Sequence, residues 1–114
     1  MSKIKVIKQD PGKEPEIVEI ENELEALQDS VGGYIQAVPL GKGNVIVICD
    51  EEGRLKGKPY NCKAGLIDFV GTILLVGEDG EDFTDVPIGL ETWKFYLWLS
   101  ENYPKVVSDG HYRS

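Results

Sequence analysis

Short runs of β-branched and apolar residues, separated by turn residues, form the main pattern along this chain. Residues 4–7 and 16–20 are two such runs, and Asp10-Pro11-Gly12-Lys13 lies between them. Proline presets φ and glycine accepts a positive φ, so this segment favours a tight turn. The N-terminus is therefore predicted to form a β-hairpin. Further strands are expected at residues 34–38, 44–49 and 66–76.

The later strands differ in how they are expected to be buried. Residues 44–49 are almost continuously apolar, which indicates a strand buried on both faces. The stretch 54–60 contains Gly57 and Pro59, so it is expected to be an edge strand or a loop. Gly71 interrupts the run 66–76 and is interpreted as a bulge. The segment 77–82 is rich in glycine and acids and is expected to be a turn.

Two helices are expected. Apolar residues at helical spacing predict a short helix over residues 23–31. Asn22, with Glu25 three positions later, is expected to cap its N-terminus, and Gly32-Gly33 is expected to end it. A second helix is predicted over residues 88–102, ended before a proline.

The order of elements, about ββαβββ(β)α, indicates an α+β fold with a small, mostly antiparallel sheet. The 114 residues are enough for one domain, which we place at residues 1–103, followed by a loose C-terminal tail at 104–114. Charges interrupt the apolar residues of the N-terminus, and no apolar run is long enough for a membrane helix. A cytoplasmic location is therefore expected. Cys49 is expected to be a buried free thiol, and Cys62, in a polar segment, an exposed one.

Several chemistries are disfavoured by the residues present. The one histidine, His111, lies in the predicted tail, so histidine-based catalysis and histidine-rich metal sites are not expected. No glycine-rich phosphate motif precedes a helix, and the acidic segment 78–82 lacks the spacing of a calcium loop. The sequence therefore predicts a protein that is not an enzyme, with no catalytic residues, no metal and no cofactor.

Charge is distributed unevenly along the chain. The formal net charge is −8, yet residues 54–63, which we call the basic loop, carry four basic residues and no acid. Direct nucleic-acid binding is disfavoured because it needs a broad basic face. Basic side chains can instead hold a small phosphate or carboxylate, and a tyrosine can stack on a base. The alternative is that lysines protect an exposed strand edge from aggregation.

The candidate ligand site combines the basic loop with the glycines that follow the first helix. Glycine allows close backbone approach to a ligand, but the position of Gly32 and Gly33 after a helix favours the alternative, a structural turn. Gly33 is expected to be needed for a positive φ or for close approach. The predicted ligand-binding residues are Gly32, Gly33, Tyr34, Arg54, Lys56, Lys58, Tyr60, Asn61 and Lys63.

Several short segments carry a resemblance to a known family. They are Pro11–Pro15, Leu24–Gln28, Val31–Ile35, Glu51–Gly53 and Pro59–Asn61. Their order and spacing resemble the domain of unknown function 3846 family, which occurs in phages and conjugative elements of Gram-positive bacteria. The resemblance implies an origin in a mobile element and supplies no activity.

These observations lead to two hypotheses of function. The first is a non-enzymatic phage or mobile-element binding protein that counters host defence by sequestering a phosphorylated small molecule or nucleotide signal. The alternative is an acidic inhibitor of a host protein, acting by protein–protein interaction or as a weak mimic of DNA.

The C-terminal helix is expected to mediate self-association, because its apolar residues lie on two opposite sides and one sheet covers only one of them. A two-fold homo-oligomer is favoured. In the alternative, the tail from Pro104 covers Phe95 and Leu99. The predicted interface residues are Trp93, Phe95, Trp98 and Leu99.

Overall fold

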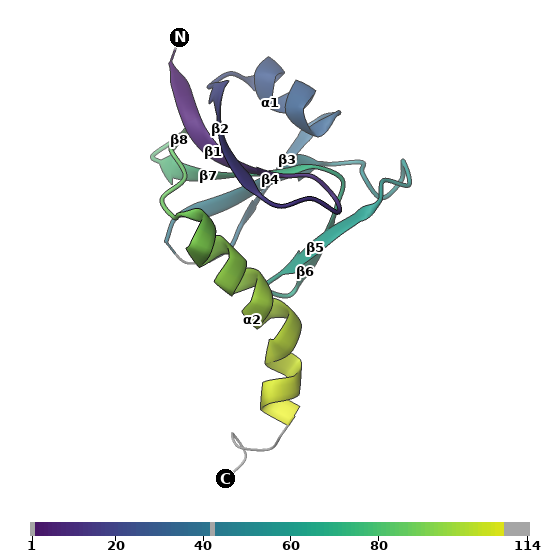
Figure 1. Ribbon diagram of the computed structural model, residues 1–114. Coiled ribbons are helices and arrows are strands. Elements are labelled where there is room, and N and C mark those ends of the chain that lie inside the picture. The colour runs from purple at the N-terminus through teal and green to yellow at the C-terminus, as the bar shows by residue number, and fades with distance from the viewer. Residues whose placement is uncertain (1, 42, 109–114) are drawn as a thin grey trace.

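The computed structural model describes residues 2–41 and 43–108, with side chains up to residue 102. It confirms the α+β fold with a mostly antiparallel sheet and two helices, one short and one C-terminal (Figure 1). The elements are β1 Lys3–Gln9, β2 Glu16–Glu21, α1 Leu24–Val31, β3 Ile35–Pro39, β4 Val45–Asp50, β5 Tyr60–Ala64, β6 Ile67–Val70, β7 Ile73–Asp79, β8 Asp82–Thr84 and α2 Leu90–Ser108.

The main sheet has the strand order β2-β1-β7-β4-β3, and β8 pairs with the end of β7. All of these pairs are antiparallel, and the predicted N-terminal hairpin is confirmed by the pairing of β1 with β2. Strands β5 and β6 form a separate hairpin. Sheet order places β2 and β3 at the two edges, so β3 has a free edge among the described strands.

Each face of the main sheet covers its own apolar core. The six residues of β4 are all buried, as the continuous apolar run predicts. Side chains alternate along a strand, so Ile46 and Ile48 pack on the face that α1 covers. Val47 and Cys49 point the other way, into a core shared with the β5–β6 hairpin and α2. The sheet is therefore the middle layer of three (Figure 1).

Helix α2 is anchored at its N-terminal half. Trp93 is fully buried, and its indole Nε1–H donates a 2.7 Å hydrogen bond to Oε1 of Gln9 in β1. Gln9 in turn donates to Asn61 Oδ1 over 3.2 Å, so one polar chain joins α2, β1 and β5. Beyond the β5–β6 hairpin, the C-terminal half of α2 projects away from the sheet (Figure 1).

Two helix ends differ from the prediction. Asn22 is not the N-cap of α1: the N-cap is Glu23, which makes no side-chain cap hydrogen bond. The Asn22 side chain instead donates to the backbone oxygen of Phe83, 3.0 Å away, and so ties α1 to β8. Helix α2 continues through Pro104 to Ser108, so the first residues of the predicted tail are helical. The remainder of that tail, with His111, lies outside the described residues.

The strand predictions also need correction in the second half of the chain. For the stretch 54–60 the loop alternative is confirmed, and strand β5, which begins at Tyr60, was not predicted. Gly71 has φ 73° and is not a bulge within one strand: it separates β6 from β7. Strand β8 was not predicted, because the acidic segment around it reads as a turn. No helix in the described part of the chain is long and apolar enough to span a membrane.

Candidate functional site

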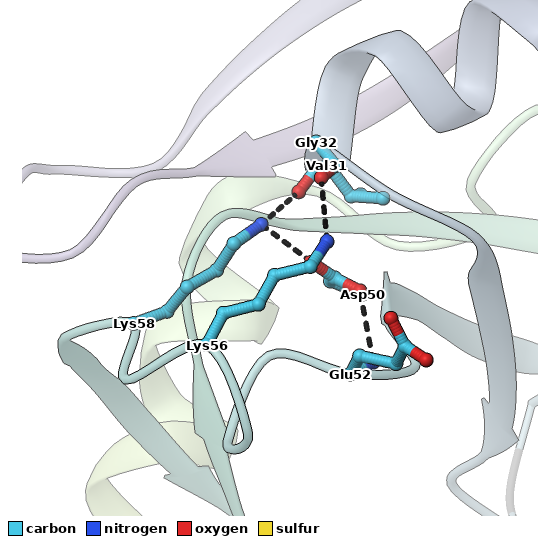
Figure 2. Close-up of polar contacts among 6 residues, drawn as sticks. All are labelled: Val31, Gly32, Asp50, Glu52, Lys56 and Lys58. Atoms are coloured by element: carbon cyan, nitrogen blue, oxygen red, sulfur yellow. Dashed lines mark hydrogen bonds and ion pairs between the residues drawn. The ribbon is translucent and has the colours of Figure 1, made fainter.

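Two lysines of the basic loop pair with a buried carboxylate, Asp50, which was not among the residues predicted from sequence. Asp50 ends β4, and its side chain is only 1% exposed. Its Oδ2 lies 2.8 Å from Nζ of Lys56 and 2.7 Å from Nζ of Lys58 (Figure 2). Its Oδ1 accepts a 2.9 Å hydrogen bond from the backbone N–H of Glu52. Two of the four basic side chains of the loop are therefore paired within the protein.

The same two ammonium groups also hold the C-terminal end of α1. Lys58 Nζ donates to the backbone oxygen of Val31 over 2.7 Å, and Lys56 Nζ donates to that of Gly32 over 3.1 Å (Figure 2). The last carbonyls of a helix lack intrahelical partners and carry partial negative charge, so cations are favourable there. The lysines thus join a buried acid to a helix end, and the acid, the lysines and the carbonyls form what we call the Asp50 network.

The two glycines after α1 have different roles in this network. Gly32 has φ 83° and closes the helix, with its N–H donating to the backbone oxygen of Gln28. Gly33 has no positive φ, but a Cβ there would lie 2.6 Å from both Asp50 Oδ1 and Lys56 Nζ. The groups that approach Gly33 closely are therefore the side chains of Asp50 and Lys56. The positive φ occurs at Gly32 instead.

The pKa of Asp50 reflects two opposing influences. Burial of the carboxylate acts to raise its pKa, because it removes water from the charged form. Hydrogen bonds from Lys56, Lys58 and the backbone of Glu52 stabilise that charged form and outweigh burial, so the pKa lies well below the ordinary value for aspartate. The carboxylate is therefore ionised at neutral pH, and each lysine beside it has a fixed counter-charge.

Other predicted ligand-binding residues also have partners within the protein. Arg54 donates from Nη2 to the backbone oxygen of Asp68 over 2.5 Å, and the Tyr60 hydroxyl lies 3.2 Å from Asp68 Oδ1. Asn61 donates from Nδ2 to the backbone oxygens of Gln9 and Gly71. It is a structural link between β1 and β5 rather than a residue facing outward. Lys63 has no ion pair among the described residues.

The structure divides the predicted ligand site between two pockets. A pocket of about 350 Å³ gathers Gly32, Gly33 and Tyr34 with Lys56, as the sequence analysis expected. Asp29 and Glu52 line it as well, so acids outnumber bases around this pocket. Arg54 lies instead at a second, larger pocket, and neither pocket includes Tyr60, Asn61 or Lys63.

The larger pocket, of about 570 Å³, is a groove between the main sheet and strand β6. Gln36 and Val38 of β3 line one side, and Ile67 and Phe69 of β6 line the other. The turn after β4 adds Leu55, which is 88% exposed, at the groove's margin. No local sequence pattern predicts this groove, because β6 lies far from β3 along the chain.

Both cysteines are free and buried, which corrects the prediction for Cys62. The side chain lies in the core between the β5–β6 hairpin and α2. Burial, followed by the charges of Glu101 and Asp68, raises the pKa of the Cys62 thiol to about 12. Burial also raises the pKa of Cys49, with Asp50 adding to the effect. Nucleophilic thiol chemistry needs the thiolate, which both sites disfavour.

Comparison with known proteins gives one match. The family model described as domain of unknown function (DUF3846) matches residues 4–95. No curated protein and no solved structure matches the chain. The matched segment covers the main sheet, the Asp50 network and both pockets, and it ends within α2.

Among the described residues, no cluster of three or more histidines, cysteines and acids is arranged to hold a metal ion.

Proposed function

The chain belongs to the domain of unknown function (DUF3846) family, and from that premise we propose that it is a non-enzymatic protein-binding domain of a phage or mobile element. It acts on a host protein, and the partner segment lies in the groove between β3 and β6. The single observation that carries this proposal is a groove with apolar side chains on both of its walls, beside a strand with a free edge.

The free edge of β3 suits an extended partner segment. In this mode of recognition, main-chain hydrogen bonds to the edge supply affinity, and side-chain pockets alongside supply specificity. Strand β3 offers five residues and ends at Pro39, which has no N–H and limits the pairing at that end. Val38, Ile67 and Leu55 provide apolar surface next to the strand. A groove of about 570 Å³ accommodates one or two large apolar side chains of the partner.

Charge around the groove favours a neutral or basic partner segment. Glu51 and Asp68 line the groove beside Arg54, whose guanidinium already donates to a backbone oxygen. The chain as a whole carries a net charge of −8, which raises the association rate with basic partners. Two of the three lysines that suggested a phosphate site, Lys56 and Lys58, are held in the Asp50 network. These features support the protein-inhibitor hypothesis over sequestration of an anion.

The experiment compares two leucines of nearly equal exposure. Leu55, at the groove, is 88% exposed, and Leu66, at the tip of the β5–β6 hairpin, is 90% exposed. Wild type, Leu55→Asp and Leu66→Asp are each immobilised and exposed to lysate of the host bacterium. We expect wild type and Leu66→Asp to retain the same host protein, and Leu55→Asp to lose it.

Amide hydrogen exchange then locates the partner on the purified complex. Binding in the groove protects the backbone of β3 and β6 and leaves the N-terminal hairpin unchanged. Equal retention by all three variants, or protection confined to another surface, contradicts the proposal.

Sequestration of a phosphorylated small molecule is a second candidate, favoured by the pocket that gathers Gly32, Gly33, Tyr34 and Lys56. Ligand binding stabilises a native protein by mass action, so nucleotides that bind should raise the melting temperature. Tyr34 is 68% exposed and outside the Asp50 network, so Tyr34→Ala should remove that shift without unfolding the protein. No shift with any nucleotide or with inorganic phosphate contradicts this candidate.

A further inference from the structure

An exposed aromatic stripe runs along the side of α2 that faces away from the sheet. Phe95 and Trp98 are 59% and 54% exposed, and Leu99 beside them is 37% exposed. The rings of Phe95 and Trp98 stack on each other, with centroids 6.2 Å apart and planes at 13°. Soluble proteins seldom leave stacked aromatic rings in water without a partner, and tryptophan is a frequent anchor of interfaces.

The opposite side of the same helix is fully engaged by the protein's own core. Trp93 is buried against β1, so it is not an interface residue, contrary to the prediction from sequence. Ser100 is buried as well, and its hydroxyl accepts a 2.7 Å hydrogen bond from the backbone N–H of Gly65. The rotation of α2 is therefore fixed, and the aromatic stripe has no freedom to turn inward.

Polar residues lie at the two ends of the stripe, and charged residues lie along one of its flanks. At 3.6 residues per turn, Glu91, Phe95, Trp98 and Asn102 fall on one line with the alternating spacing of four, three and four residues. Lys94 and Glu101, seven residues apart, lie together along one flank of that line, and both are exposed. One flank thus carries a cation toward the N-terminal end and an anion toward the C-terminal end.

We propose that α2 pairs with α2 of a second copy of this chain in antiparallel orientation, across a two-fold axis near Phe95 and Trp98. In an antiparallel helix pair, like flanks face each other. Lys94 of each copy then lies opposite Glu101 of the other, which gives two symmetric ion pairs. In a parallel helix pair, this flank faces the opposite flank of the partner, so Lys94 and Glu101 do not lie opposite each other. The charge pattern therefore favours a second copy of this chain as the partner, with the two α2 helices antiparallel.

The contact is small, so association is expected to be weak and dependent on concentration. Large exposed aromatic rings contribute most of the apolar area, and the flanking ion pairs, being exposed, set orientation more than affinity. Lys94 now lies 3.3 Å from Glu14, a side chain that is itself 84% exposed. Such a loose surface pair is readily exchanged for one with Glu101 of the second copy. The proposal concerns α2 alone and does not depend on the groove between β3 and β6.

Sedimentation equilibrium across micromolar to sub-millimolar protein, at low salt, tests the proposal. We expect wild type to shift toward dimer as concentration rises. Trp98→Glu should be monomeric throughout, and Leu24→Glu should dimerise like wild type, because Leu24 is similarly exposed, at 58% against 54%, and lies on α1 on the other face of the sheet. Circular dichroism confirms that each variant remains folded. A wild type that is monomeric at every concentration overturns the proposal and leaves the stripe to the residues after Ser108 or to a different protein.

Charge reversal tests the antiparallel direction separately. Lys94→Glu and Glu101→Lys should each weaken the dimer by several fold, because each places like charges opposite one another twice. The double variant K94E/E101K should restore it, and a mixture of the two single variants should form a heterodimer more readily than either forms a homodimer. Failure of both rescues, with the wild type dimeric, overturns the antiparallel pairing.

Discussion

Nζ of Lys58 lies 2.7 Å from Oδ2 of Asp50 and also 2.7 Å from the backbone oxygen of Val31. One ammonium group therefore neutralises the most buried acid of the loop region and, at the same time, the end of α1. This contact joins strand β4, helix α1 and the loop after β4 into one unit.

Removing the charge of Asp50 should destabilise the protein strongly. Asp50→Asn keeps the size of the side chain but leaves two lysines without a counter-charge beside a helix end. We expect a loss of about 2–3 kcal/mol in the free energy of unfolding, less than for a fully buried pair because both lysines are partly exposed. Urea denaturation measures this loss. Glu52→Gln, at an exposed carboxylate, is the control and should change little; an equal effect of both substitutions would contradict the assignment.

The contribution of Asp50 to the free energy of unfolding should decrease at low pH. Its pKa in the folded protein is lowered, so the folded state binds the proton less readily than the unfolded chain. The stabilisation is complete above the unfolded pKa, about 3.9, and is lost as pH falls below that value toward the folded pKa. The stability gap between wild type and Asp50→Asn should therefore shrink below about pH 4. A gap that stays constant from neutral pH into that acidic range speaks against this account.

Gly33 should tolerate no side chain. A Cβ at this position lies 2.6 Å from Asp50 Oδ1, so Gly33→Ala forces the buried carboxylate or the backbone to move. We expect a cost of about 1–3 kcal/mol in unfolding free energy, typical of overpacking. A double-mutant cycle with Asp50→Ala provides the control, because the cost should fall when the carboxylate is absent. Additive effects of the two substitutions contradict a clash between them.

The thiols of Cys49 and Cys62 should react only when the protein unfolds. Burial hides both side chains and raises both pKa values, that of Cys62 to about 12, so little thiolate forms at pH 8. We expect a disulfide reagent to label neither thiol rapidly in native protein and both in urea. Rapid native labelling of Cys62 would show that the hairpin and α2 separate easily.

The sequence by itself determined the local elements. Alternating and continuous apolar runs predict β1, β2 and the doubly buried β4, because side-chain direction along a strand depends only on position. The glycines after Val31 predict the end of α1, since a left-handed residue there is a local requirement. Apolar residues on both sides of α2 predict a helix with more apolar surface than one sheet covers, as the exposed Phe95 and Trp98 show.

Only the tertiary structure decided which of the candidate residues meet. A run of lysines reads as a free basic patch, because nothing local reveals that Asp50 and the α1 carbonyls lie beside them. The contact from Lys58 to Val31 spans 27 positions, and that from Trp93 to Gln9 spans 84. The burial of Cys62 and the groove between β3 and β6 likewise depend on where the β5–β6 hairpin docks. Charge neutralisation and burial are properties of neighbours in space, and the order of residues in the chain does not specify them locally.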